Sequence, residues 1–131
     1  MEIRIQANPI FKIVNTSDKR YIVMKGSAGS GKSVDTAQNY ILRLLKDNGR
    51  NLVCIRKSDI TNRDSTYAEL SGAIYRMFGD KADKYFKFIQ SPLKIECRAN
   101  GNQIIFRGMN DDRQREKLKS ITFKKGKLTD V

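Results

Sequence analysis

The chain has 131 residues, 39% of them apolar, a length and composition that fit one folded domain with a modest core. Its 26 Lys and Arg residues outnumber 14 Asp and Glu residues, and this formal net charge of +12 points to a polyanionic partner such as nucleic acid or anionic lipid. Histidine is absent, which excludes Ser-His-Asp and Cys-His nucleophiles and histidine-ligated metal sites within this chain.

Cysteine usage and hydropathy predict the compartment. Cys54 and Cys97 lie far apart, each inside an apolar stretch, which favours reduced core residues of a cytoplasmic protein over a disulfide. No apolar run approaches the roughly 18 residues of a membrane span, and residues 1–9 are too polar for a signal peptide. We therefore expect a soluble intracellular protein without a membrane partner, folded as one unit.

The first predicted elements are a strand, a helix and a second strand. Residues 21–25 form a short apolar run before glycine-rich sequence, which is typical of a strand buried on both faces. From Lys32 onward a 3.6-residue period predicts a helix, which Gly49 can close in the left-handed conformation. The apolar positions of this helix are Val34, Ala37, Ile41, Leu44 and Leu45. The run from Asn51 to Lys57 predicts the next strand, so the three elements together predict a parallel crossover unit.

A second helix is predicted in the middle of the chain. Thr66 and Glu69 have the spacing of a capping box, which would begin the helix, and Gly79 would end it. The apolar face of this helix consists of Leu70, Ile74, Met77 and Phe78.

An antiparallel hairpin is predicted next. Apolar and charged residues alternate from Leu93 to Arg98, and an apolar run resumes at 103–107 after Asn100-Gly101, a strong hairpin signal. The last residues, 128–131, predict the beginning of a final apolar strand.

The region before that final strand is strongly basic. Its seven cations are Arg113, Arg115, Lys117, Lys119, Lys124, Lys125 and Lys127. A charge run of this kind is often a solvated face, but with a net charge of +12 we favour contact with a polyanion.

The glycine-rich segment carries the motif G-x-x-x-x-G-K-[ST] between the expected first strand and helix. Its residues are Gly26, Ser27, Ala28, Gly29, Ser30, Gly31, Lys32 and Ser33. The glycines let backbone N–H groups turn inward around phosphate oxygens, and the helix N-terminus adds partial positive charge. We expect Lys32 to bridge the terminal phosphates as a catalytic residue and Ser33 to bind Mg²⁺. The alternative is a Gly/Ser-rich loop that merely connects strand and helix.

Hydrolysis needs acidic residues at the end of a second buried strand, where they organise the metal ion and the attacking water. The apolar runs at 52–55 and 104–106 end instead in Arg56 and Arg107, so the carboxylate-bearing strand is missing. Asp130 lies at the start of the possible final strand, which is the wrong end for a metal-associated acid. The chain alone is therefore not expected to complete hydrolysis.

Three cations follow the second expected strand, at the sheet edge where ligands of open α/β sheets gather. They are Arg56, Lys57 and Arg63. One of them can meet the nucleotide, and Arg56 is our candidate for a second catalytic residue. The alternative is that all three are solvated loop charges or contact DNA phosphates.

Four segments, taken in order, resemble a known family. They are the phosphate loop at 26–33, Cys54 to Ser58, Arg63 to Thr66, and Ile105 to Asp112. With these segments the chain resembles the large terminase subunit of tailed bacteriophages, closest to the type found in phages and prophages of Gram-positive bacteria. The resemblance extends from Asn8-Pro9 to Val131.

Members of that family are packaging motors, in which an N-terminal P-loop ATPase domain drives duplex DNA into an empty capsid and a C-terminal nuclease domain cuts it. The resemblance implies ATP and Mg²⁺ as cofactors. Lys32 and Ser33 match the family's phosphate-loop lysine and magnesium-binding hydroxyl, and the segment from Asn8 to Phe11 lies where the adenine base is held. The implied partners are duplex DNA, the small terminase subunit, the portal protein and further copies of the full-length motor subunit, in the host cytoplasm at the procapsid portal.

The resemblance also implies that residues 1–131 are the N-terminal portion of the ATPase domain. The family's acidic strand should begin near Leu128, so we expect the chain to end before or within it and to contain no nuclease domain. The expected fold is an α/β P-loop NTPase, with a mainly parallel sheet flanked by helices, an added antiparallel hairpin and an incomplete C-terminus. Two other functions stay open: a small P-loop kinase, which would need a lid and a substrate-binding carboxylate, and a basic nucleic-acid-binding module with a vestigial phosphate loop.

Overall fold

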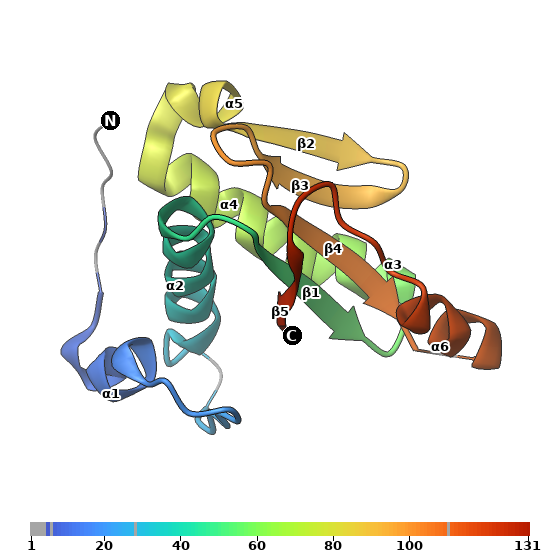
Figure 1. The fold of residues 1–131 in the computed structure, drawn as a ribbon. Helices are drawn as coiled ribbons and strands as arrows, with labels where there is room; N and C mark the ends of the chain where they lie inside the picture. Colours follow the sequence, from blue (N-terminus) through green and yellow to red (C-terminus); the bar gives the residue numbers. More distant parts are fainter. Residues whose placement is uncertain (1–4, 6, 28, 110) are drawn as a thin grey trace.

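The computed structural model describes residue 5 and residues 7–27, 29–109 and 111–131, and it places a mixed sheet at the centre of the fold (Figure 1). The five strands of the sheet in the described residues lie in the order β2-β3-β4-β1-β5. Their bounds are β1 Arg50–Arg56, β2 Phe86–Gln90, β3 Leu93–Cys97, β4 Gln103–Gly108 and β5 Lys127–Asp130. β1, β4 and β5 are parallel, whereas β2 and β3 form an antiparallel addition beside β4. The expected mixture of parallel strands and an added hairpin is confirmed.

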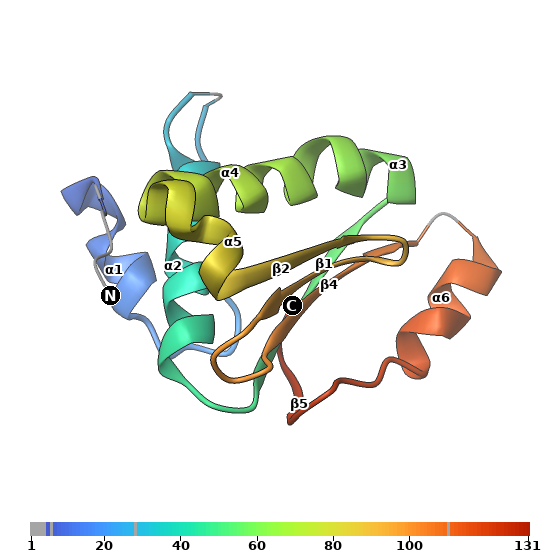
Figure 2. The ribbon, with the colours of Figure 1, turned by 90° about the horizontal axis from the view of Figure 1, so that it is seen from above.

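Helices flank this sheet on two sides. Their bounds are α1 Lys12–Thr16, α2 Lys32–Lys46, α3 Asp59–Thr61, α4 Ala68–Phe78, α5 Ala82–Tyr85 and α6 Asp112–Lys119, with single 3-10 turns at Pro9–Phe11 and Gly79–Lys81 and a π-helical segment at Asn62–Tyr67. Figure 2 shows α4 and α6 on opposite sides of β4. Within the described residues, none of these helices has the length and apolar character needed to cross a membrane.

The core lies between the sheet and the apolar faces of α2 and α4, because both helices repeat buried apolar residues at helical spacing. Its main members are Ala37, Ile41, Leu44, Leu52, Leu70, Ala73, Ile74, Met77, Phe78, Phe86, Ile95, Ile104 and Phe106. The apolar face predicted for the second helix is therefore confirmed. Of the face predicted for the first, Val34 is 39% exposed and Leu45 is only partly buried.

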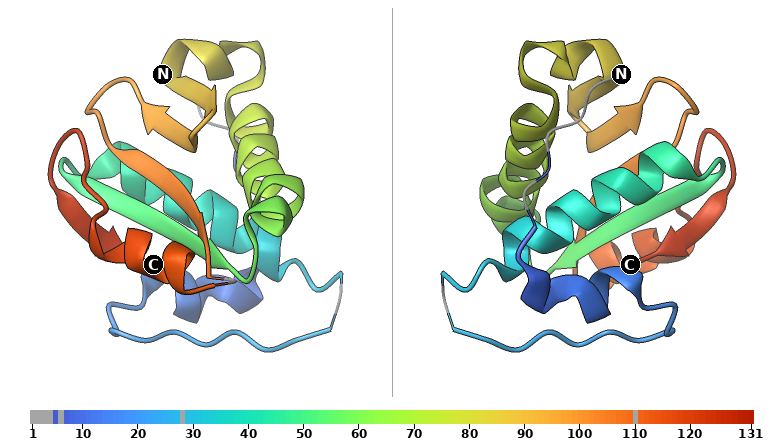
Figure 3. Two further views of the ribbon diagram at one scale, coloured as in Figure 1. Left: turned by 90° about the vertical axis from the view of Figure 1, so that its right-hand side faces the viewer. Right: turned by 90° about the vertical axis from the view of Figure 1, so that its left-hand side faces the viewer.

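The strand predicted at residues 21–25 was wrong. The segment has no strand structure; Tyr21 is 79% exposed and Val23 is 92% exposed. Figure 3 shows this part of the chain running outside the sheet. Both sides of β1 are already paired, with β4 on one side and β5 on the other, so neither position beside β1 is available to residues 21–25. The predicted crossover unit, which required this strand, is accordingly absent from the described residues.

Two predicted helix boundaries also need correction. Thr66 does not cap a helix, because the chain is already helical from Asp59 and continues through the π-helical segment into α4 without a side-chain cap. Gly49 is left-handed, with φ of 77°, but α2 ends three residues earlier, at Lys46 with Asp47 as its C-cap, and Gly49 instead turns the chain into β1. Gly79 does close α4, with φ of 62°.

The hairpin predicted around Asn100-Gly101 is confirmed. Ile95 faces Ile104 and Lys94 faces Ile105 in antiparallel register, and Gly101 takes the positive φ of 76° that the turn requires. β2, which pairs with β3, was not predicted, nor was α6 in the basic region. Both cysteines are free thiols, as expected.

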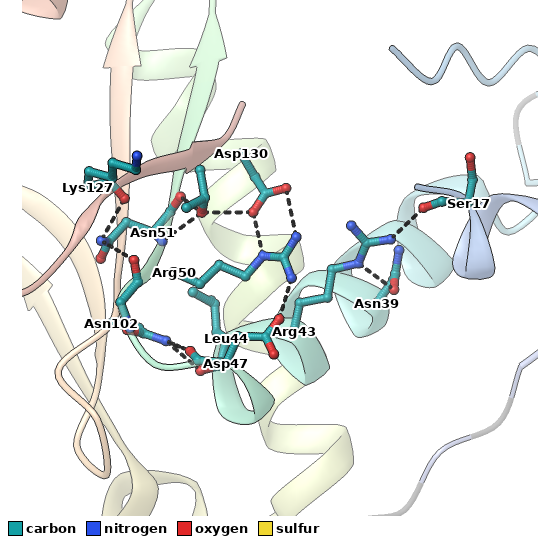
Figure 4. A network of polar contacts seen from close by, with 12 residues as sticks. Ser17, Asn39, Arg43, Leu44, Asp47, Arg50, Asn51, Asn102, Lys127 and Asp130 are labelled. Carbon is teal, nitrogen blue, oxygen red and sulfur yellow. Dashed lines mark hydrogen bonds and ion pairs between the residues drawn. The ribbon is translucent and has the colours of Figure 1, made fainter. Parts of the chain in front are cut away.

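Two buried asparagines tie α2, β4 and β5 together (Figure 4). Asn102 is fully buried; its Nδ2 donates to the carbonyl oxygens of Leu44 and Asp47 near the end of α2, and its Oδ1 accepts from the Gly49 N–H. Asn51, also fully buried, donates through Nδ2 to the carbonyl oxygens of Lys125 and Lys127. These amides satisfy backbone groups that helix and strand ends leave unpaired, so they fix where α2 lies relative to the sheet.

Candidate functional site

The phosphate loop leads directly into α2, whose N-cap is Gly31. Gly31 has φ of 90° and Gly29 has φ of 78°, a left-handed backbone that a side chain would strain. The Asp35 N–H donates to the Gly31 carbonyl over 3.0 Å, which closes the first helical turn. The loop thus has the backbone turns that its glycines predict and stands at the positive end of a helix dipole, although Ala28 lies outside the described residues.

Lys32 folds back over the loop. Its Nζ donates to the carbonyl oxygens of Gly26 at 2.7 Å and Ser27 at 3.0 Å, and to Ser30 Oγ at 3.1 Å. A Cβ at position 26 would lie only 3.3 Å from both Nζ and that Oγ, so a side chain there would press on this arrangement. The ammonium group thus has three oxygen partners within the loop, so it would bind a further oxygen ligand such as a phosphate by exchanging one or more of these bonds.

Lys32 and Ser33 line a cleft of about 600 Å³ between α2, β1 and α4, which we term the Lys32 cleft. Arg56, at the end of β1, lines the same cleft, so the structure brings together all three side chains proposed for catalysis and metal binding. One acidic side chain also lines it: Glu69 of α4, whose Oε1 lies 3.8 Å from Arg76 Nη2. Sequence reasoning treated Glu69 only as a capping residue, because its distance from the loop along the chain gives no sign that the two meet.

Cys54 also lines the Lys32 cleft, and burial raises the pKa of its thiol to about 12. The thiol therefore stays protonated near neutral pH and is a poor nucleophile. Asp130 does not line the cleft: its carboxylate accepts from Arg50 Nε at 2.7 Å and from Arg50 Nη2 at 3.4 Å. This ion pair holds Asp130 against the first residue of β1.

Arg63 lies away from the Lys32 cleft. Its guanidinium donates to Gln90 Oε1 at 3.2 Å and to the Gln90 carbonyl at 3.1 Å. With Arg107 and Lys117 it lines a second cleft of about 560 Å³, the Arg107 cleft, near the tip of the β2–β3 hairpin. Three cations from three separate elements line this cleft, and none of the described residues that line it is acidic.

Part of the basic region is neutralised locally. Arg115 pairs with Asp112, Lys119 with Glu116 and Lys124 with Glu96. In the part of the chain that the structure describes, no such ion pair involves Lys117, which is therefore better placed than Lys119 to meet an external anion.

A third cleft, of about 810 Å³, lies on the other side of the phosphate loop, and we term it the Asp35 cleft. It is lined by loop residues Ser30 and Gly31, by the 8–11 segment, and by Asp35 and Gln38 of α2. The Phe11 ring approaches the loop closely, since a Cβ on Gly31 would lie 3.5 Å from it. The 8–11 segment is therefore next to the loop, as the resemblance implies for residues near a nucleotide base.

Comparisons with known proteins agree with this geometry. A family model described as phage terminase large subunit matches residues 18–131. The chain is 35% identical over 117 residues to the PBSX phage terminase large subunit of Bacillus subtilis (strain 168), a match that covers 88% of this chain and 25% of that protein. It is 28% identical over 114 residues to the terminase large subunit of Bacillus phage SPP1, covering 87% of this chain and 26% of that protein.

The chain thus spans about a quarter of the length of these curated relatives. No significant match to a solved structure was found. Because the family match takes in the phosphate loop, α2 and every strand of the described sheet, the chain belongs to the phage terminase large subunit family.

Proposed function

We propose that this chain is the ATP-binding part of a viral DNA-packaging motor and has the P-loop NTPase fold. The observation that carries the proposal is the phosphate loop at the N-terminus of the 15-residue α2, with Lys32 folded into it and Ser33 and Arg56 in the adjoining cleft. Backbone N–H groups, a helix dipole and a lysine at one point form a site for the phosphates of a nucleotide. The three parallel strands β4, β1 and β5 support the fold assignment.

The residues of the loop have separate tasks in this proposal. Lys32 would hold the terminal phosphates, exchanging its bonds to the Gly26 and Ser27 carbonyls for bonds to phosphate oxygens. Ser33, whose side chain is exposed in the Lys32 cleft, would bind Mg²⁺, and Arg56 would stabilise negative charge from the opposite wall. When bound, MgATP supplies the phosphoryl group whose transfer drives the motor.

Hydrolysis by residues 1–131 alone is not part of the proposal. Phosphoryl transfer depends on acidic groups that position the metal and the attacking water, and among the described residues Glu69 is the one acidic side chain that lines the Lys32 cleft. Asp130, the other candidate from the sequence, is paired with Arg50. We therefore assign turnover, and its coupling to DNA movement, to the full-length motor, of which these residues form the N-terminal portion of the ATPase domain.

We assign contact with duplex DNA to the Arg107 cleft and the neighbouring α6. Arg63, Arg107 and Lys117 give the cleft three positive charges, and its lining in the described part of the chain contains no acidic residue, a pattern that suits backbone phosphates rather than base edges. The family relationship further leads us to propose the small terminase subunit, the portal protein and other copies of the motor subunit as partners, with the host cytoplasm at the procapsid portal as the place of action.

A titration with a fluorescent ADP analogue, with and without Mg²⁺, tests the nucleotide site. Wild type should bind more tightly with Mg²⁺, and Ser33→Ala should lose this dependence while still binding the metal-free nucleotide. Thr36→Ala, one turn further along α2 in the same cleft, is the matched control and should behave as wild type. Absence of nucleotide binding would favour the basic nucleic-acid-binding module, and phosphorylation of an added acceptor would favour the kinase.

A duplex-DNA titration over a range of salt concentrations tests the second assignment. Since each phosphate contact contributes about −0.9 to the slope of log affinity against log salt, Arg107→Ala and Lys117→Ala should each reduce the slope by roughly that amount. Lys81→Ala, an exposed lysine outside the Arg107 cleft, is the control. Equal slopes for all four proteins would refute this location of the DNA contact.

A further inference from the structure

Two acceptor atoms beside the phosphate loop lack donors. Asp35 is only 5% exposed, and within the described residues the hydrogen bond of its carboxylate comes from Asn15, whose Nδ2 donates to Asp35 Oδ1 over 2.8 Å. The other carboxylate oxygen, Asp35 Oδ2, and the amide oxygen, Asn15 Oδ1, are both buried without a hydrogen-bond partner in the described structure. Of the two residues, Asp35 lines the cleft and so offers it an unpaired carboxylate oxygen.

Two buried acceptors of this kind lower the stability of the fold unless a hydrogen-bond donor pairs with them. A buried acceptor without a donor costs on the order of a lost hydrogen bond, and more when the group is charged. The position of Asp35 in the first turn of α2 favours its negative charge through the helix dipole, but this leaves the lone pairs of Oδ2 unused. The Asn15 bond fixes the orientation of the carboxylate, which is an arrangement suited to receiving an N–H group.

The location of the pair indicates which N–H group this is. Asp35 and Gln38 line the Asp35 cleft together with Ser30 and Gly31 of the phosphate loop, while Pro9 and Phe11 add apolar surface. Because the cleft borders the loop, the base of a nucleotide whose phosphates lie in the loop can reach it. Apolar walls with a few convergent polar groups are the usual surroundings of a bound base.

We infer that Asp35, positioned by Asn15, accepts a hydrogen bond through Oδ2 from the 6-amino group of adenine and so determines base specificity. This inference rests on the proposed nucleotide site. The unpaired Asp35 Oδ2 matches one of the two hydrogens of this exocyclic amine and leaves the other for a second acceptor. Gln38, 8% exposed in the same cleft, carries the donor and acceptor that pair with the N7 and the N6 amine of adenine.

Purine riboside triphosphate tests the inference, because it has the phosphates and sugar of ATP but only hydrogen at C6. Wild type should bind ATP at least about tenfold more tightly than this analogue, as expected for a hydrogen bond to a charged acceptor. In Asp35→Ala the ratio should fall to the small preference that Gln38 can supply, and in Asp35→Asn it should fall partway, because a neutral acceptor is weaker. Both variants should bind inorganic tripolyphosphate as wild type does.

The controls separate this inference from the proposed function. Asp80→Asn makes the same chemical change at an exposed position outside the cleft and should leave the ratio unchanged. Equal wild-type affinity for ATP and the analogue, with both lost in Lys32→Ala, would overturn the inference and leave the nucleotide site standing. GTP binding as tightly as ATP would overturn the adenine assignment, since guanine can give a carboxylate its own N–H groups. Absence of all nucleotide binding would overturn both proposals.

Discussion

Replacing Asn102 by alanine should destabilise the fold more than its small size suggests. The side chain is fully buried and makes three hydrogen bonds to backbone groups between α2 and β1. The Leu44 carbonyl keeps a second donor, Asn100 Nδ2 at 2.7 Å, but the Asp47 carbonyl and the Gly49 N–H lose the only partners that the described structure gives them. The substitution therefore leaves two unpaired backbone groups.

The expected loss of unfolding free energy is about 2–4 kcal/mol, since each orphaned group costs about 1–3 kcal/mol and partial exposure of Asp47 and Gly49 keeps the sum below the upper limit. That loss is a large fraction of the stability of a small domain. Urea unfolding followed by far-UV circular dichroism measures it through the midpoint and slope. Asn48→Ala, at a neighbouring exposed position, should change stability by less than about 0.5 kcal/mol. A loss below about 1 kcal/mol in Asn102→Ala would refute the account of the network.

The remaining predictions concern turnover, pH and thiol reactivity. Purified chain with MgATP should release phosphate no faster than Lys32→Ala; a clearly faster rate would show that residues 1–131 hold their own catalytic acid. The hydrogen bond from Lys124 holds the pKa of Glu96 below its usual value, so its stabilisation is present above the unfolded pKa and lost as pH falls through the folded pKa. Urea unfolding should therefore show Glu96→Gln less stable than wild type near pH 7 but equal well below pH 4.5; a gap that persists in acid would contradict this. Burial raises the thiol pKa of Cys54 and Cys97, so a thiol reagent at neutral pH should label the folded chain far more slowly than the urea-unfolded chain.

Local patterns predicted the elements whose partners lie close in sequence. The helical period after Lys32 and the Asn100-Gly101 turn led to α2 and the β3–β4 hairpin, because both signals depend on neighbouring residues. Residues 21–25 show why apolar runs mislead: the composition favours a strand, but a strand forms only beside a partner, and β4 and β5 occupy both sides of β1. The strand at Phe86–Gln90 begins with alternating apolar and charged residues, a pattern that favours a strand. In contrast, α6 is charged on all sides and has no apolar period that would predict a helix.

The candidate site was predictable only as far as its motif extends. The spacing of Lys32 and Ser33 from the glycines identifies the loop without a structure, because the motif is local. The position of Glu69 in the Lys32 cleft and the hydrogen bond between Asp35 and Asn15 depend on how α4 and α1 pack near the loop. Such packing produces no motif of fixed spacing in the sequence, so it could not be predicted. The Arg107 cleft likewise brings together cations from three elements, and nothing in the sequence distinguishes these cations from the other basic residues.

The most direct test of the central claim is calorimetric titration of MgATP into wild type, Lys32→Ala and Lys46→Ala. Lys32 is the cation that the structure places in the phosphate loop, and Lys46 is an exposed lysine at the other end of the same helix. The account predicts that Lys32→Ala weakens binding by roughly ten- to a hundred-fold, the loss expected for charge-assisted contacts, while Lys46→Ala binds as wild type does. Equal affinities for all three proteins would contradict the claim that the loop at 26–33 holds the phosphates of ATP.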